Sequence, residues 1–104
     1  MPVAALLEFQ VGDKDVGLDW YERVSREVAG KDRFEQRSDW TGGMLAHVAG
    51  YTDDGAIWAV DVWESQEDMD RWMQTVMPIL EPAVKEFGEP TVRVLNVHNL
   101  VTEG

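Results

Sequence analysis

The chain has 104 residues, 44% of them hydrophobic, which suits one small folded domain spanning residues 1–104. Its formal net charge is −11, so its field repels phosphate, and we expect neither a nucleic acid nor a membrane as a partner. It has no cysteine, which excludes disulfides, thiolate nucleophiles and iron–sulfur clusters, and a cytoplasmic location fits this composition.

The first part of the chain predicts a strand, a helix and a long loop. Residues 3–11 alternate as a strand does, with apolar side chains on one face at Val3, Ala5, Leu7, Phe9 and Val11. Asp13 or Asp15 is expected to cap a helix that runs to about residue 29, where Gly30 ends it. Residues 30–43 are rich in charge and glycine and predict a loop.

The second part predicts a hairpin, a second helix and a last strand. Residues 43–51 and 56–64 read as strands on either side of a turn at 52–55. Ser65 is expected to cap a helix whose apolar stripe runs to Phe87. Pro78 and Pro82 lie inside that stripe, so we expect a kink or a break near Met77. Residues 91–101 predict the last strand.

The resulting order, βαββαβ, is that of the ferredoxin-like α+β fold, in which two helices cover one face of a four-stranded antiparallel sheet. Residues 56–64 and 91–101 are nevertheless apolar on both faces. The uncovered face would carry apolar area at or above the roughly 300–600 Å² found on typical monomers. We therefore predict a homodimer in which two sheets face each other as a barrel. The alternative is that the strand ends or the C-terminal tail fold over that face.

The register of the hairpin decides whether the chain's two best chemical groups meet. If residues 53–55 form a three-residue loop with Gly55 left-handed, His47 lies opposite Asp61 and Leu45 opposite Trp63. A loop of two or four residues turns His47 to the opposite face.

His47 and Asp61 are the catalytic candidates, because a paired imidazole can take a phenolic or enolic proton. A histidine hydrogen-bonded at a dimer seam is the alternative for His47. A structural ion pair is the alternative for Asp61, whose partner is expected to be His47, Arg93, Arg23 or Arg26.

Aromatic and methionine side chains are expected between the sheet and the helices, where they either line a ligand site or fill the core. The candidates for substrate binding are Trp63, Trp72, Tyr21, Met69 and Met73. His98 and Asn99, near the chain end, are expected to pack at the dimer interface rather than to extend the pocket. The sequence has no motif for a metal, flavin, nicotinamide or phosphate site, so no cofactor is predicted.

Residues 60–67, Val-Asp-Val-Trp-Glu-Ser-Gln-Glu, join the end of the third strand directly to an acidic helix start. With the βαββαβ order, this segment resembles the dimeric α/β-barrel superfamily, in particular its antibiotic-biosynthesis-monooxygenase-like branch. The resemblance covers nearly the whole chain. It implies a pocket between sheet and helices that Trp63 lines. It also implies one of two activities: cofactor-independent monooxygenation of electron-rich aromatic compounds, or haem binding and degradation.

Two departures argue against haem degradation. The haem branch uses an asparagine on the first strand, and residues 3–11 contain none. It also uses an iron-ligating histidine on the second helix, whereas no histidine occurs between Trp63 and His98. The sequence therefore favours a cofactor-independent monooxygenase-like enzyme acting on a small aromatic or hydrophobic substrate. A non-catalytic protein that binds a small hydrophobic ligand and a purely structural homodimer are the alternatives.

Overall fold

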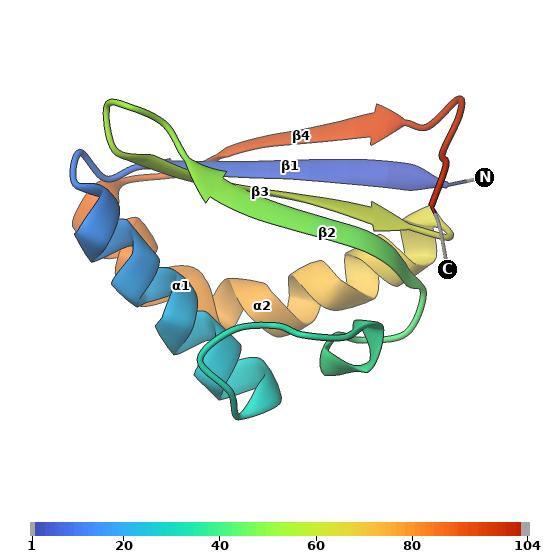
Figure 1. Ribbon diagram of the computed structural model, residues 1–104, viewed down its shortest axis with the longest axis horizontal. Coiled ribbons are helices and arrows are strands. Elements are labelled where there is room, and N and C mark those ends of the chain that lie inside the picture. The colour runs from blue at the N-terminus through green and yellow to red at the C-terminus, as the bar shows by residue number, and fades with distance from the viewer. Residues whose placement is uncertain (1, 103–104) are drawn as a thin grey trace.

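The fold is a four-stranded sheet with both long helices on one face (Figure 1). The computed structural model describes residues 2–102, with the elements β1 (Val3–Gln10), α1 (Lys14–Ala29), η1 (Arg37–Asp39), β2 (Met44–Tyr51), β3 (Ala56–Trp63), α2 (Gln66–Phe87) and β4 (Thr91–Asn96). The strands run in the order β2-β3-β1-β4, and every neighbouring pair is antiparallel. The predicted ferredoxin-like α+β fold is confirmed.

Local signals set the ends of both helices. The carboxylate of Asp13 accepts hydrogen bonds from the backbone N–H of Asp15 at 2.9 Å and of Val16 at 3.4 Å, so Asp13 caps α1. Gly30 ends α1 with a left-handed φ of 73°. Ser65 caps α2 by accepting the backbone N–H of Asp68 at 3.2 Å. No helix among residues 2–102 is both long and apolar enough to cross a membrane.

Of the two outcomes expected near Met77, a kink or a break, the second helix does not show the break. α2 runs unbroken from Gln66 to Phe87 with Pro78 and Pro82 inside it. Proline removes one hydrogen bond and crowds the preceding turn, at a cost of about 3 kcal/mol in a helix interior. Val76, Leu80 and Ala83 are buried on either side of the prolines. Packing of this stripe against the sheet holds the helix together across both interruptions.

The hairpin between β2 and β3 has the predicted three-residue loop. Gly55 is left-handed with φ 87°, and the backbone N–H of Thr52 donates to the carbonyl of Ala56 at 2.9 Å. His47 is consequently the register partner of Asp61. The predicted pairing of Leu45 with Trp63 is wrong, because an irregularity between Met44 and Ala46 puts Met44 opposite Trp63.

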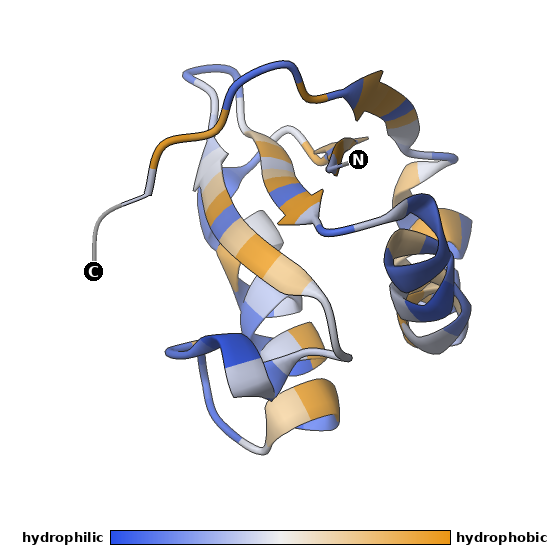
Figure 2. Ribbon diagram, turned by 90° about the vertical axis from the view of Figure 1, so that its right-hand side faces the viewer, coloured by the Kyte–Doolittle hydropathy of each residue, from blue (hydrophilic) through white to orange (hydrophobic). Residues whose placement is uncertain are grey.

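The last strand is shorter than predicted, since β4 ends at Asn96 rather than at residue 101. The backbone N–H of Val97 still donates to the carbonyl of Pro2 at 3.2 Å, after which the chain leaves the sheet. The departing segment carries apolar residues that are orange in Figure 2. Leu100 and Val101 there are both exposed. This tail therefore keeps its own apolar side chains in solvent.

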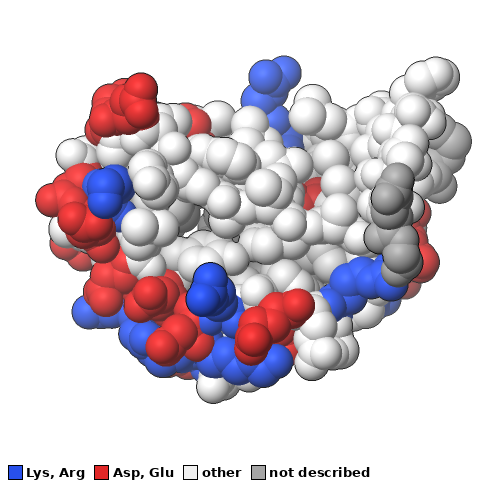
Figure 3. All heavy atoms as spheres, in the orientation of Figure 1, with Lys and Arg blue, Asp and Glu red and all other residues white. Residues whose placement is uncertain are grey.

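The face of the sheet that the helices leave open is apolar. Register and alternation place Leu6, Val48, Val60, Val62 and Leu95 on it. Val48 is 53% exposed and Leu95 is 42% exposed. Charged side chains gather around the helices, while much of the surface over the strands is uncharged (Figure 3). All six residues of β4 are exposed, so neither helix shelters that edge strand.

Candidate functional site

A cavity of about 90 Å³ lies between the sheet and the two helices. α1 can approach β3 beside it because residue 17 is glycine; a Cβ there would lie 1.9 Å from Cγ1 of Ile57. The wall is mainly aromatic and aliphatic, with one short polar stretch. The residues that line the cavity include Tyr21, Phe34, Trp40, His47, Asp61 and Trp72.

The polar stretch begins with His47 and Asp61, which the hairpin register places side by side. Nδ1 of His47 and Oδ1 of Asp61 are hydrogen-bonded to each other. Asp61 is only 8% exposed, and a buried carboxylate is costly unless it is paired. His47 supplies that pairing, so among the predicted partners of Asp61 the imidazole is the one in contact. Arg93 lies on the opposite face of the sheet, while Arg23 and Arg26 pair with other carboxylates on the surface of α1.

Tyr21 of α1 extends this pair into a chain of three groups. Its hydroxyl lies 2.7 Å from Nε2 of His47, and the two rings are nearly parallel with centroids 6.1 Å apart. Burial, with a smaller contribution from the charge of Asp61, raises the pKa of Tyr21 to about 12. The Tyr21 phenol is therefore a neutral O–H group over the ordinary pH range.

Two aromatic side chains that the sequence reasoning missed complete the wall over His47. Phe34 and Trp40 stack with centroids 4.3 Å apart, and lie 5.7 Å and 4.7 Å from the His47 ring. Both come from the segment between α1 and β2, which was predicted only as a loop. The available signal was an aromatic pair in an otherwise charged loop, and loops are where binding residues concentrate.

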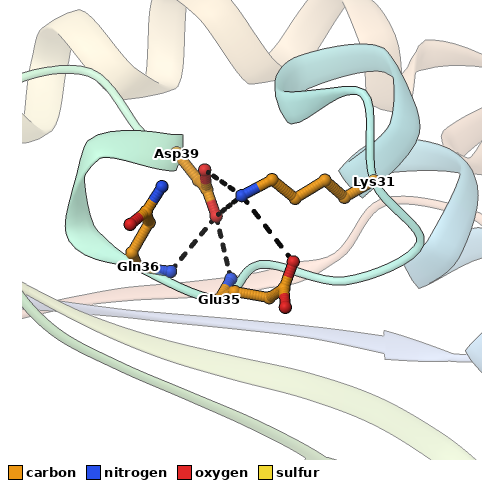
Figure 4. Close-up of polar contacts among 4 residues, drawn as sticks. All are labelled: Lys31, Glu35, Gln36 and Asp39. Atoms are coloured by element: carbon orange, nitrogen blue, oxygen red, sulfur yellow. Dashed lines mark hydrogen bonds and ion pairs between the residues drawn. The ribbon is translucent and has the colours of Figure 1, made fainter.

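A polar clasp gives this segment its shape (Figure 4). Nζ of Lys31 lies 3.1 Å from Oδ1 of Asp39, and Oδ2 of Asp39 accepts the backbone N–H groups of Glu35 at 2.8 Å and Gln36 at 3.1 Å. These hydrogen bonds, the backbone N–H of Glu35 first, lower the pKa of Asp39. The clasp closes the loop that carries Phe34 and Trp40.

The predicted substrate-binding residues divide into two groups. Tyr21 and Trp72 line the cavity. Trp63, Met69 and Met73 do not: Trp63 and Met69 are buried in the core beyond it, and Met73 packs against that core. The register explains the difference, because Trp63 lies two residues along β3 from Asp61, next to Met44.

The other candidate residues from the sequence lie away from the cavity, and no metal site is formed among residues 2–102. His98 and Asn99 are exposed in the tail after β4, away from the cavity lining. Within residues 2–102, no group of three or more histidine, aspartate or glutamate side chains is arranged to hold a metal ion. At the cavity wall, His47 contacts both Asp61 and Tyr21, so these three groups are the ones placed to exchange a proton.

Comparisons with known proteins give structural relatives only. No protein-family model matches the chain. No curated protein matches it in sequence. A protein of unknown function from Nitrosomonas europaea superposes with a TM-score of 0.74 at 9% identity, over 99% of this chain and 95% of that one. SnoaB, a cofactor-independent oxygenase from Streptomyces nogalater, gives 0.64 at 13% identity, over 98% of each chain.

A further relative, a proposed antibiotic biosynthesis monooxygenase from Chloroflexus aurantiacus, gives a TM-score of 0.55 at 14% identity, over 97% of this chain and 98% of that one. This chain has the antibiotic-biosynthesis-monooxygenase-like fold. The resemblance inferred from residues 60–67 is thus confirmed as a likeness of fold. Identities this low carry no activity across, because one fold serves many functions. The function of this chain has to be argued from its own site.

Proposed function

We propose that this chain is a cofactor-independent monooxygenase-like enzyme that acts on a small aromatic or hydrophobic substrate in the cavity. One observation carries the proposal: His47 bonds a buried carboxylate through Nδ1 and presents Nε2 at the cavity wall. Asp61 stabilises the imidazolium that forms when His47 takes a proton, which suits His47 to act as a general base.

The reaction needs no cofactor if the substrate supplies the electrons. A phenol or enol that gives its proton to Nε2 of His47 becomes an electron-rich anion that can react with dioxygen. When the activated carbon is a methylene, the balance is R₂CH₂ + O₂ → R₂C=O + H₂O, with all four electrons coming from the substrate. One oxygen atom enters the product and the other leaves as water.

The mainly apolar wall of the cavity supports a second candidate, a non-catalytic protein that binds a small hydrophobic ligand. A dry cavity of about 150 Å³ holds benzene, and ligand pockets commonly span about 300–1,000 Å³. The 90 Å³ present here is smaller than either. An aromatic substrate therefore requires a wall to move. The segment carrying Phe34 and Trp40 is the wall with the least regular structure.

Oxygen consumption with an acidic enolisable probe, 1,3-indanedione, whose central methylene fits the balance given above, tests the enzyme. We expect uptake that falls at least a hundredfold in His47→Gln and Asp61→Asn, in line with the loss of a general base, roughly 10²–10⁴-fold. His98→Gln and Asp53→Asn change an exposed histidine and an exposed aspartate and are expected to keep the activity. Binding without oxygen uptake would favour the second candidate, and equal uptake in all variants would remove His47 from the mechanism.

We also propose that the working form is a homodimer paired through the sheet faces. The support is the apolar outer face, where Val48 and Leu95 are exposed, together with the unsheltered strand β4. Light scattering at micromolar concentration is expected to give twice the chain mass, and Val48→Glu to give the mass of one chain. A single-chain mass for the unmodified protein would refute the dimer.

A further inference from the structure

We propose that Tyr21 sets the specificity of this site: its hydroxyl occupies the position on His47 that a substrate hydroxyl must take over, so the site ionises only phenols and enols that are much more acidic than tyrosine. This inference rests on the proposed function, because it names the substrate class of the same site.

Only one nitrogen of His47 is available to accept a proton from a substrate. Nδ1 faces the carboxylate of Asp61, so the proton of the neutral imidazole belongs on Nδ1, and Nε2 is left as an acceptor. Tyr21 O–H then donates to Nε2 across 2.7 Å. The base is therefore already hydrogen-bonded, and an incoming hydroxyl has to displace Tyr21.

The surroundings of the Tyr21 hydroxyl make any hydroxyl in that position harder to ionise. Tyr21 lies beside His47 from β2 and the negative charge of Asp61 from β3, with the ring of Phe34 packed edge-on at 6.0 Å. Burial and the Asp61 charge disfavour a second anion there, and the pKa of Tyr21 is about 12 as a result. A phenol of ordinary acidity meets the same penalty and stays neutral.

These surroundings give the chemical class of substrate. Only a group that is more acidic than an ordinary phenol overcomes this penalty and transfers its proton to Nε2. Phenols that carry electron-withdrawing groups and enols of 1,3-dicarbonyl compounds have that acidity. In the transfer, the substrate O–H bond breaks, the N–H bond at Nε2 forms, and the imidazolium is left between the substrate anion and Asp61. Tyr21 keeps its proton throughout.

The test uses 4-nitrophenol, whose phenolate is coloured, and nitrobenzene, a ligand of similar shape without the hydroxyl. At a pH between the pKa of free 4-nitrophenol and that of free phenol, we expect bound 4-nitrophenol to show the phenolate band and bound unsubstituted phenol to stay neutral. Tyr21→Phe keeps the ring and removes the competing hydroxyl. It is expected to bind 4-nitrophenol about three- to tenfold more tightly, the value of one hydrogen bond, and nitrobenzene unchanged.

Three further variants complete the design. Tyr51→Phe, at the exposed tyrosine of β2, is expected to behave as the unmodified protein. His47→Gln should abolish the phenolate band, and Tyr21→Leu should tighten 4-nitrophenol at least as much as Tyr21→Phe does. Weaker binding of 4-nitrophenol to Tyr21→Phe, or equal tightening of both ligands, would overturn the inference and leave the site standing.

The proposed function fails separately from this inference. If the binding results are as expected but no probe consumes oxygen, the monooxygenase proposal falls while the role of Tyr21 in ligand choice is retained. If neither nitro compound binds to the unmodified protein, both proposals fall together.

Discussion

The space between the sheet and the helices has two ends that are built from similar side chains but filled differently. At one end, Trp63 is fully buried, and it packs with Met44, Met69 and Trp72, whose ring centroid lies 6.0 Å away. At the other end, Tyr21 and His47 face the cavity. Both ends are aromatic, so composition does not separate them.

The difference lies in what closes each end. At the packed end, Met69 and Trp72 of the regular helix α2 pack with Trp63. Later residues of the same helix also line the cavity. The hollow end is closed by the segment between α1 and β2, whose Phe34 and Trp40 are held by loop contacts. A regular helix fills space efficiently, whereas a loop leaves room beside a paired histidine. The fold thus gains stability at one end and room for a ligand at the other.

The largest loss of folding stability is expected when the side chain that fills the packed end is removed. Trp63→Ala removes a side chain that is 0% exposed and should lower the free energy of unfolding by about 3–5 kcal/mol. Trp40→Ala, at the hollow end, removes the same side chain from a half-buried site and is expected to cost less than half as much. Urea denaturation measures both, and equal losses would contradict the distinction between the two ends.

The next effect concerns the buried polar pair at the hollow end. Asp61→Leu leaves His47 without its partner at Nδ1 and is expected to cost about 1.5–3 kcal/mol, the range for hydrogen bonds to charged groups. Asp53→Leu, at the tip of the exposed hairpin, should stay within about 0.5 kcal/mol of the unmodified protein. A neutral or stabilising Asp61→Leu would mean that the pair is kept for chemistry alone.

The sequence predicts the paired groups of the hollow end but not the loop that covers them. The left-handed turn at Gly55 fixes the register of the hairpin, and that register brings His47 to Asp61. Such signals are local, because a turn type depends on a few neighbouring residues. The placement of Trp40 depends instead on how a charged loop folds back over the sheet, and the unbroken α2 depends on packing that outweighs Pro78 and Pro82. Long-range packing of this kind has no short signature.

The third prediction concerns alkaline pH and Tyr21. Its pKa is about 12 in the folded chain, against about 10 for an ordinary tyrosine, so the neutral phenol stabilises the folded state below pH 10. Between about pH 10 and 12 the unfolded chain releases this proton and the folded chain keeps it, so stability falls as the pH rises. Ultraviolet titration of the folded protein should show a late phenolate step near pH 12. Tyr21→Phe should lose that step and Tyr51→Phe should keep it.

The smallest effect is expected from loosening the clasp that shapes the hollow end. The pKa of Asp39 is lowered by the backbone N–H of Glu35 and by Lys31, so its carboxylate holds the segment above the ordinary carboxyl pKa and releases it as the pH falls through the lowered value. Asp39→Asn removes this charge and weakens the contact to Lys31. The Asp39 side chain is only 7% exposed, but Lys31 is 36% exposed, and an asparagine oxygen can still accept the backbone N–H groups of Glu35 and Gln36. The unfolding midpoint should therefore move little.

The readout for the clasp is local. Hydrogen exchange in residues 31–41 should speed up severalfold in Asp39→Asn, while the amides of β1 and β3 exchange as before. If the segment is the wall that moves aside, 4-nitrophenol should also enter faster in this variant. Asp32→Asn, which alters the exposed pair with Arg26 on the same stretch of chain, is the matched control and should leave ligand entry unchanged. Faster exchange without faster entry would place the moving wall elsewhere, at Tyr21 itself, and the two variants Asp39→Asn and Tyr21→Phe together decide which group admits the ligand.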